Sequence, residues 1–549
     1  MRASLKREIN LLEVFCIASG AMISSGLFVL PAIAFTKVGP ALFLSYLLAS
    51  FIAVPTMLSM AELATAMPKS GGDYFYISRS LGPVMGMFAG TASWFSLSLK
   101  SVFALIGMAA YLELVFPFIP LKLFSVCLCV FFIIINIVGI KEAAKTQVML
   151  VLFLISLLLL YIIVGFLHIN IERFIPFVPY GFKSILFTSA MVFVSYGGLT
   201  KVTAVAEEIK NPSRNIPLGM ILSLIIVGLI YSLVIFVTTG LVPAEALVRT
   251  YTPISDGAGI FWGNIGKIVM AFAALLSFIS TANAGIISAS RYPIALSRDK
   301  LLPKFFSLIN RKFSTPHYSI IITGLFMILV VILLDLEILV EIASAMIILS
   351  YILANIAVIV MRESKVLSYK PKFTAPLYPY LQILGILLGG LLIYQMGMKI
   401  ITLSLILIVF AFLWYLIYAA ARYIHEYALI HVVERLLNKE LSSGKLYEEL
   451  KEIIHQRDNI VEDRFDFLIK ESMVLDLDEQ LYMEDFFRKL SLQLADELNI
   501  KPEKLMELFI KREKSSSTVL REGLAIPHIV IEGEGKFKII LVRAKKGII

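Results

Sequence analysis

Residues 20–26 read GAMISSG, and they interrupt a stretch that is otherwise apolar enough for one continuous membrane helix, with NLLEVFCIAS before them and LFVL after them. An unbroken helix satisfies its own backbone hydrogen bonds, so a break at membrane depth leaves N–H and C=O groups that are costly to bury unpaired. A second interruption, SYGGLT at 195–200, also falls partway along an apolar run. Two such breaks predict a polar binding site inside the membrane, and close helix packing by small residues is the alternative interpretation.

The composition around these breaks indicates an integral membrane protein. Of the 549 residues, 59% are hydrophobic and 16% are charged, which is far more apolar than a soluble core requires. Runs such as 148–166 and 220–240 reach the ~20 residues that cross a lipid bilayer. The net charge of +9 indicates no nucleic-acid partner, because the lysine and arginine residues cluster in the loops between the apolar runs. Cys16, Cys127 and Cys129 lie inside apolar runs, which predicts neither a disulfide nor a metal site.

Twelve apolar spans can be assigned along the chain. Gly26 and Gly198 fall in the first and sixth of them, so each glycine opens a set of five helices. That spacing is typical of a 5+5 inverted repeat in which helices 1 and 6 are discontinuous and the substrate lies between the repeats. We therefore expect an all-α polytopic membrane protein with spans at approximately 9–34, 40–66, 83–116, 120–140, 147–168, 183–206, 216–241, 262–292, 317–335, 338–361, 378–399 and 401–422.

The charges between the spans predict the orientation. Lysine and arginine concentrate before the first span and in alternate loops, such as the predicted loop with Lys69 and Arg79, which places the amino terminus on the cytoplasmic side of the cell membrane. With an even number of spans, the carboxyl terminus is cytoplasmic as well. After residue 422 the composition becomes charged, which indicates a soluble cytoplasmic extension whose first helix is interrupted at Ser443 and Gly444.

Four stretches resemble one group of transporters. GAMISSGLFVLP (20–31) is similar to the G-x-x-I-G-S-G-I-F signature of the amino acid/polyamine/organocation superfamily of permeases, and FVSYGGLTKVTAVAEEIKNPSRNIP (193–217) resembles its sixth helix. AELATAMPKSGGDYFY (61–76) resembles the end of its second helix, and STANAGIISASRYPIALSRDKLLP (280–303) resembles its eighth helix with the loop that follows. The resemblance covers roughly residues 9–422.

The resemblance implies secondary active transport of amino acids or related amines by alternating access, either ion-coupled or by exchange. The N–H groups of Ser24, Ser25 and Gly26, at the start of the second half of helix one, would receive a substrate carboxylate. The carbonyls around Tyr196 and Gly197 would receive its amino group. Ser24 departs from the signature, because it replaces a glycine and so narrows the backbone conformations open there. The substrate-binding residues implied in this way are Ile23, Ser24, Ser25, Gly26, Tyr196, Gly197 and Gly198.

Two lysines lie where charge is costly. Lys100 is near the centre of the third span, where a lysine costs about 3 kcal/mol, so it should face the interior of the helix bundle. There it can titrate, contact a substrate carboxylate or replace a bound cation, and a structural ion pair is the alternative. Lys201 lies three residues beyond Gly198, and pairing with Glu62 or Glu207 is its structural alternative.

The coupling ion, sodium or proton, is open from the sequence. Sodium-coupled members of the superfamily bind the ion between the helix-one break and hydroxyls of helix eight, where this chain has Ser277, Ser280 and Thr281. Such hydroxyls also bond carbonyls of their own helix. Some proton-coupled members carry a lysine in helix five, at a place that aligns approximately with Leu154, and this span contains no lysine. We expect no other cofactor, no metal and no enzymatic activity, and no P-loop of the form G-x-x-x-x-G-K-[ST] occurs.

The extension carries a second resemblance. REKSSSTVLREGLAIPHIV (512–530) is similar to the phosphorylation site of the type-2 IIA domain of the bacterial sugar phosphotransferase system, and the chain ends in the strand-like KFKIILVRAKKGII. The resemblance implies that His528 accepts phosphate beside Arg512 from a phosphodonor or regulatory partner; a sensor that has lost phosphotransfer is the alternative. It also implies an incomplete or truncated domain, because such domains continue for several more elements. We expect a membrane domain at 1–422, a charged helical linker at 423–463 and a small α/β regulatory domain at 464–549.

Two other functions are kept beside amino acid transport. The membrane domain can be a ligand sensor that reports to the extension without transport. It can also transport inorganic ions, either by cotransport of a cation and chloride or by transport of potassium alone. An amino acid zwitterion requires both helix ends to be free for a ligand. An anion requires Lys100 to point at the helix-one break.

Overall fold

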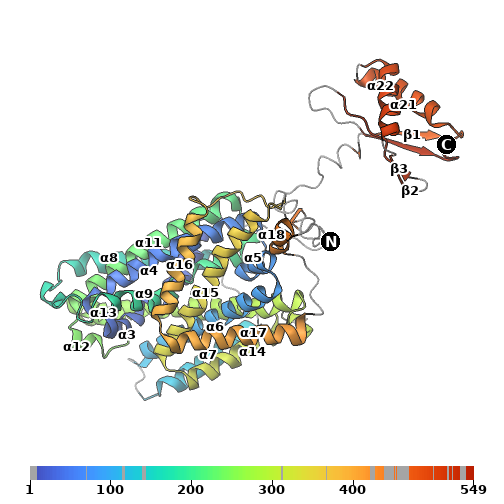
Figure 1. Cartoon of the computed structure of the whole chain (residues 1–549). Coiled ribbons are helices and arrows are strands. Elements are labelled where there is room, and N and C mark those ends of the chain that lie inside the picture. The colour runs from blue at the N-terminus through green and yellow to red at the C-terminus, as the bar shows by residue number, and fades with distance from the viewer. Residues whose placement is uncertain are drawn as a thin grey trace. The chain divides into compact units, whose positions relative to one another are not determined.

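The long apolar runs form helices in the computed structural model of the chain (Figure 1). Contacts between residues divide the chain into two units, Met1–Arg457 and Asp458–Ile549, and each unit is described by itself. The structure describes residues 9–548 apart from 70, 114–117, 139–143, 311–312, 314, 367, 421–426, 438–449, 452, 454–468, 471, 499, 516–517, 522–523 and 532–538.

The described part of the first unit consists of helices joined by short connections. Two of the helical segments, α2 and α10, are short pieces at the two sequence breaks. In chain order the helices are α1 (Leu11–Met22), α2 (Ser25–Phe28), α3 (Leu30–Val38), α4 (Leu42–Ala66), α5 (Gly72–Leu81), α6 (Pro83–Glu113), α7 (Leu121–Val138), α8 (Ala144–Phe166), α9 (Phe182–Val192), α10 (Leu199–Ala204), α11 (Pro212–Leu241), α12 (Ala244–Leu247), α13 (Pro253–Arg298), α14 (His317–Leu333), α15 (Leu336–Glu363), α16 (Tyr380–Gln395), α17 (Met398–Trp414) and α18 (Ala428–Leu437).

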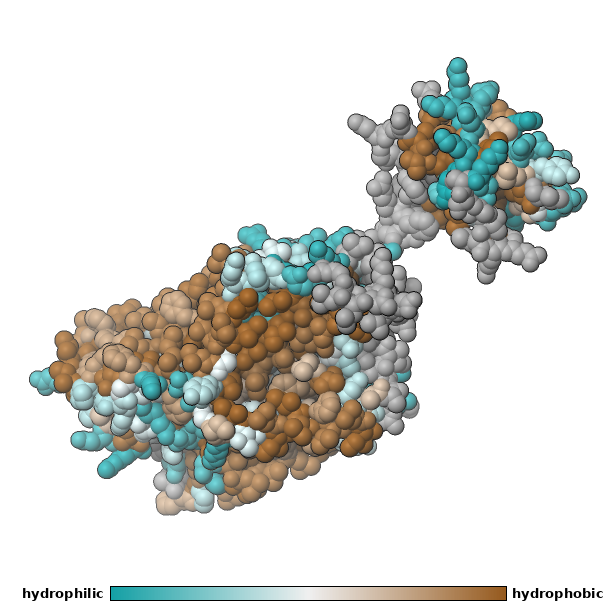
Figure 2. All heavy atoms as spheres, in the orientation of Figure 1, coloured by the Kyte–Doolittle hydropathy of each residue, from teal (hydrophilic) through white to brown (hydrophobic). Residues whose placement is uncertain are grey.

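The described helices have the length and surface of membrane spans. Nine helical stretches within the described residues are long and apolar enough to cross a bilayer, and α1, α14 and α16 are shorter apolar helices. The count of twelve spans and the inverted repeat stay predictions. Hydrophobic side chains cover most of the visible face of this unit, and hydrophilic side chains gather toward its edges (Figure 2). Exposed leucine, isoleucine and phenylalanine side chains of this kind are expected where a helix faces lipid.

Two helical segments differ from the sequence-based prediction. The predicted loop with Lys69 and Arg79 contains α5, which glycines with positive φ flank at both ends, Gly71 at 128° and Gly82 at 93°. α5 was missed because its side chains are polar, although most of them are buried between other helices. The predicted span 262–292 is the second part of α13, since Gly263 has a φ of 59° and separates it from a helix that begins at Pro253.

The interior of the first unit is organised around α6. This helix packs along α13 and α15, while α11 packs against α4 and α1. The amino-terminal segment is fixed to the end of the second break, because the N–H of Ile9 donates to the carbonyl of Glu208 and the N–H of Lys210 donates to the carbonyl of Ile9. Both discontinuous helices are therefore joined at this end of the unit.

The second unit is a small α/β structure. β1 (Met473–Leu477) pairs in parallel with β4 (Ile540–Ala544), which confirms the strand predicted near the end of the sequence. β2 (Val519–Arg521) and β3 (Leu524–Ala525) form an antiparallel pair. The hydrophobic core lies between α21 (Met483–Leu498) and α22 (Pro502–Ser515), where Phe487 and Phe509 stack at 5.2 Å between ring centroids. The interruption predicted at Ser443 and Gly444 lies outside the described residues.

Candidate functional site

Hydroxyl groups from three surrounding helices hold the first break. α1 ends at Met22 and α2 begins at Ser25, so the backbone carbonyls around them have lost their helical partners. Side chains of α4, α11 and α13 supply replacements. Tyr231 donates to the carbonyl of Met22 at 2.6 Å, Ser277 donates to that of Ile23 at 2.5 Å, and Tyr46 donates to that of Gly26 at 2.6 Å.

Ser24 fits the bend without strain. Its φ of −161° and ψ of −149° describe extended backbone that any residue adopts, so the missing glycine of the signature is not needed for this conformation. The Ser24 hydroxyl accepts a hydrogen bond from the N–H of Ser25 at 2.6 Å. One of the three N–H groups predicted to receive a carboxylate is therefore already capped by a side chain.

The second break is longer than the first. α9 ends at Val192, a 3₁₀ segment covers Phe193–Tyr196, and α10 begins at Leu199. Ser344 of α15 bridges the gap, because its hydroxyl accepts from the N–H of Val194 at 3.0 Å and donates to the carbonyl of Met191 at 2.6 Å. As at the first break, side chains replace the lost helical hydrogen bonds, which is the condition for irregular backbone at membrane depth.

The two breaks pack directly against each other. A β-carbon on Gly26 would overlap the Ser195 hydroxyl and lie 3.2 Å from the Ser195 Cα. A β-carbon on Gly198 would lie 2.7 Å from the carbonyl oxygen of Ala18 and 2.8 Å from the backbone nitrogen of Met22. These glycines therefore serve close backbone approach, as the packing interpretation predicted, and the binding site stays a prediction.

Lys100 reaches the second break. Its side chain is 5% exposed, as the cost of a charge in this span predicted, and its Nζ donates to the carbonyl of Val194 at 3.1 Å. Lys100 thus points at the helix-six break and not at the helix-one break, so the condition for an anion site is not met. In this conformation Lys100 is hydrogen-bonded to the carbonyl of Val194, a group that a substrate amino group could otherwise use.

The predicted partners of Lys201 bind other cations. Lys201 is a buried residue of α10. Glu207 lies 3.7 Å from Lys69, and Glu62 lies 2.5 Å from Arg362. The structure therefore assigns these two carboxylates to ion pairs that the sequence did not predict.

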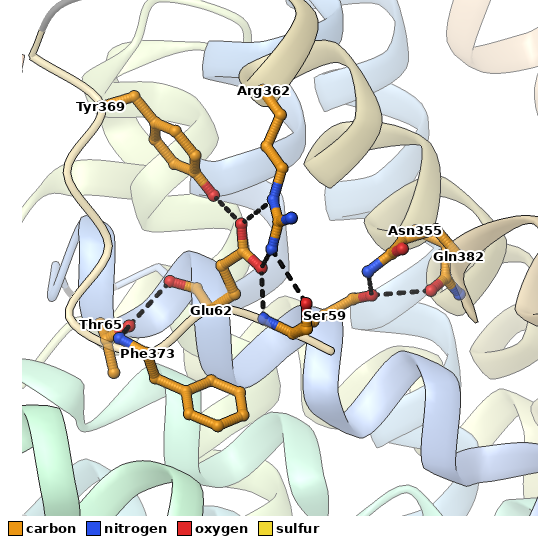
Figure 3. Close-up of polar contacts among 9 residues, drawn as sticks. Ser59, Glu62, Thr65, Asn355, Arg362, Tyr369, Phe373 and Gln382 are labelled. Carbon is orange, nitrogen blue, oxygen red and sulfur yellow. Dashed lines mark hydrogen bonds and ion pairs between the residues drawn. The ribbon is translucent and has the colours of Figure 1, made fainter. Parts of the chain in front are cut away.

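Glu62 is the centre of a polar cluster that joins α4 to α15 and to the segment after it (Figure 3). Its carboxylate is fully buried and accepts two hydrogen bonds from Arg362, at 2.8 and 2.5 Å. The hydroxyl of Tyr369 donates to it at 2.9 Å and the N–H of Ala375 at 2.8 Å. This bidentate ion pair fixes the end of α15 against α4.

Two of the three hydroxyls predicted on helix eight, those of Ser277 and Ser280 in α13, lie beside the first break. A cavity of about 20 Å³ is lined by Ile23, Leu154, Ser277 and Ser280, among others. Thr281 is buried, and its hydroxyl has no hydrogen-bond partner among the described residues. A cavity of this size holds about one water molecule, so an amino acid requires movement of the helices before it can enter.

The second unit brings His528 and Arg512 together. The Nε of Arg512 on α22 donates to Nε2 of His528 at 3.3 Å, and Nδ1 of His528 lies 3.1 Å from the carbonyl of Ile526. These partners are consistent with a proton on Nδ1 and a lone pair on Nε2. The side chain of His528 is exposed and accessible to a partner.

Fold and geometry together define a polytopic membrane protein in which two discontinuous helices meet in the core. The chain belongs to the amino acid permease family, which matches residues 9–431. Residues 467–549 match a second family, the EIIA 2 domain of the phosphoenolpyruvate-dependent sugar phosphotransferase system. Both resemblances found in the sequence are thereby confirmed, and the chain is an integral membrane protein.

The chain is similar to transporters from bacteria and plants. The branched-chain amino acid permease BcaP of Bacillus subtilis (strain 168) is 27% identical over 441 residues, which cover 76% of this chain and 94% of that protein. The methylthioribose transporter of the same organism is 27% identical over 405 residues, covering 70% and 87%. Cationic amino acid transporter 1 of Arabidopsis thaliana is 24% identical over 375 residues, covering 65% and 63%.

Proposed function

We propose that the chain is a secondary active transporter of amino acids or related amines, which moves its substrate across the cytoplasmic membrane by alternating access. The observation that carries the proposal is the contact between two helix breaks whose backbone groups bond to movable side chains. A substrate amino group can replace Lys100 at the carbonyl of Val194. A substrate carboxylate can approach the N–H groups of Ser24, Ser25 and Gly26, at the positive end of α2.

Similarity to a branched-chain amino acid permease and to a cationic amino acid transporter supports an amino acid as the substrate. Bound substrate would replace, as hydrogen-bond partners of the backbone, the side chains that bond to the breaks in this conformation. The helices could then move during transport without leaving unpaired backbone groups in the membrane. We propose coupling to sodium or protons, or exchange, with both termini in the cytoplasm.

Uptake into proteoliposomes tests this function. Purified full-length protein should take up labelled leucine or lysine with saturation, faster under an imposed sodium or proton gradient or against preloaded amino acid. Liposomes without protein provide the background. Uptake of chloride or potassium but of no amino acid would establish the inorganic-ion alternative. Saturable binding without uptake would establish a sensor.

We propose that phosphate on His528 regulates transport. With Nδ1 bonded to a backbone carbonyl, Nε2 is the nitrogen that takes the phosphate once it gives up its hydrogen bond from Arg512, which can then pair with the phosphate that forms. The modification would add about two negative charges to this surface. The lysine and arginine residues of the loops predicted to be cytoplasmic can then attract the phosphate.

His528→Ala is expected to lose all labelling when phosphoenolpyruvate and the phosphocarrier proteins of the sugar phosphotransferase system are supplied. Uptake by the wild type should change upon phosphorylation, and uptake by the variant should stay constant. His168→Ala is the matched control, because His168 is an exposed histidine of the first unit that bonds the carbonyl of Val164. Equal labelling of wild type and His528→Ala would contradict the proposal.

A further inference from the structure

Another buried carboxylate, that of Asp73, belongs neither to the ion pairs of Glu62 and Glu207 nor to the contacts around Gly26 and Gly198. Asp73 of α5 is 1% exposed. Its oxygens accept hydrogen bonds from neutral donors on three other helices and on its own: Ser93 of α6 at 2.5 Å, Tyr292 of α13 at 2.7 Å, Ser350 of α15, and the N–H of Tyr74 at 3.1 Å.

The donors of Asp73 do not neutralise its charge. No lysine or arginine nitrogen of the described residues lies within 4 Å of its carboxylate, and the nearby Arg79 pairs instead with Asp299 at 3.0 Å. An ionised carboxylate is costly to bury unless a cation accompanies it, and buried charges in proteins are paired or coordinate metal ions. A positive charge is therefore needed at Asp73 when it is ionised.

A cavity of about 10 Å³ lies beside Asp73 and extends to the second break. Gly197 of the break forms part of its wall, and the residues with polar side chains that line it are Asp73, Ser93, Ser96, Thr200, Ser350 and Tyr351. That volume matches a single water molecule or a bare ion, so a ligand with a carbon skeleton does not fit in this conformation. Carboxylate and hydroxyl oxygens are the ligands of hard cations, and one carboxylate balances one positive charge.

We propose that Asp73, with the hydroxyls of Ser93 and Ser350, binds a monovalent alkali cation. The two hydroxyl oxygens lie 3.3 Å apart, and both face the same carboxylate oxygen. Each hydroxyl can rotate its hydrogen away and turn a lone pair toward the ion. The site links α5, α6 and α15 and borders the second break, so its occupancy changes the packing around α10. It is separate from the hydroxyls of Ser277 and Ser280, which lie beside the first break.

Binding of radioactive sodium to the purified full-length protein, in the absence of amino acid, tests the inference. The wild type should bind sodium with saturation at constant pH and ionic strength, with choline as the replacement cation. Asp73→Asn should weaken that affinity by about 10- to 100-fold, the loss typical of a perturbed metal site. The Ser277→Ala/Thr281→Ala double variant should keep the component that depends on Asp73.

Asp256→Asn is the matched control. Asp256 also accepts hydroxyl hydrogen bonds, from Thr250 and Thr252, but it lies in the first part of α13 and outside the cavity. Its variant should bind sodium as the wild type does. If Asp73→Asn does not elute as a folded protein, the Ser93→Ala/Ser350→Ala variant replaces it, with the same expected loss.

The inference is overturned if the wild type binds no sodium with saturation, or if the variants of the site bind it with unchanged affinity. It deepens the proposed transport function but fails separately from it. Sodium binding without amino acid uptake would contradict the proposed transport function and support the ion site. Amino acid uptake without sodium binding would do the reverse.

Discussion

Gly198→Ala is expected to reduce substrate uptake strongly. The added methyl group would meet the backbone of α1, namely the carbonyl oxygen of Ala18 and the nitrogen of Met22, and backbone cannot rotate aside as a side chain can. Overpacking of this kind costs about 1–3 kcal/mol, which lowers the population of the packed state by about 5- to 150-fold. The transport cycle would then lack the conformation in which the two breaks meet. Initial uptake rates in proteoliposomes, normalised to the amount of reconstituted protein, measure the effect.

The prediction includes an order of effects. Gly26→Ala should be less damaging than Gly198→Ala, because the nearest backbone atom to its β-carbon, the Ser195 Cα, lies at 3.2 Å, whereas Gly198→Ala meets backbone atoms at 2.7 and 2.8 Å. Gly390→Ala is the matched control, since a β-carbon on this glycine of α16 meets no atom within 4 Å. Equal uptake by Gly198→Ala and Gly390→Ala would contradict the close contact of the two breaks.

The breaks themselves could be predicted from the sequence because they depend on local chemistry. Glycine and serine inside an apolar run weaken the helix at a definite residue, and α1 ends within GAMISSG as expected. α5 could not be predicted in this way. Its side chains are as polar as those of a surface loop, and only packing between other helices shows that Asp73 and Arg79 are buried.

The partners of the buried charges depend on how helices cross in space. The cost of a charge in the membrane predicted that Lys100 faces inward, but its partner is a backbone carbonyl, that of Val194, which has no signature in the sequence. The sequence suggested Glu62 as one of two possible partners of Lys201 and indicated no partner for Glu62 at the end of the tenth predicted span. Glu62 pairs with Arg362, and no local pattern relates residues 300 positions apart.

Arg362→Met is expected to lower the free energy of unfolding by about 3 kcal/mol, the lower end of the range for breaking a buried ion pair. The Glu62 side chain is 0% exposed and that of Arg362 is 21% exposed, so solvent screens this pair only slightly. Without the guanidinium, the carboxylate would keep two donors, Tyr369 and the N–H of Ala375, and no countercharge from Arg362. Thermal unfolding of the purified variant and the wild type in the same detergent measures the loss.

A second substitution separates a lost attraction from a stranded charge. In the Glu62→Gln/Arg362→Met double variant no carboxylate is left behind, so its destabilisation should be smaller than the sum of the two single effects. Glu337→Gln is the control, because Glu337 pairs with Lys37 at the surface, where such pairs contribute at most about 1 kcal/mol. Strict additivity in the double variant would mean that Glu62 and Arg362 contribute independently. In that case the ion pair between Glu62 and Arg362 would not stabilise the packing of α4 against α15.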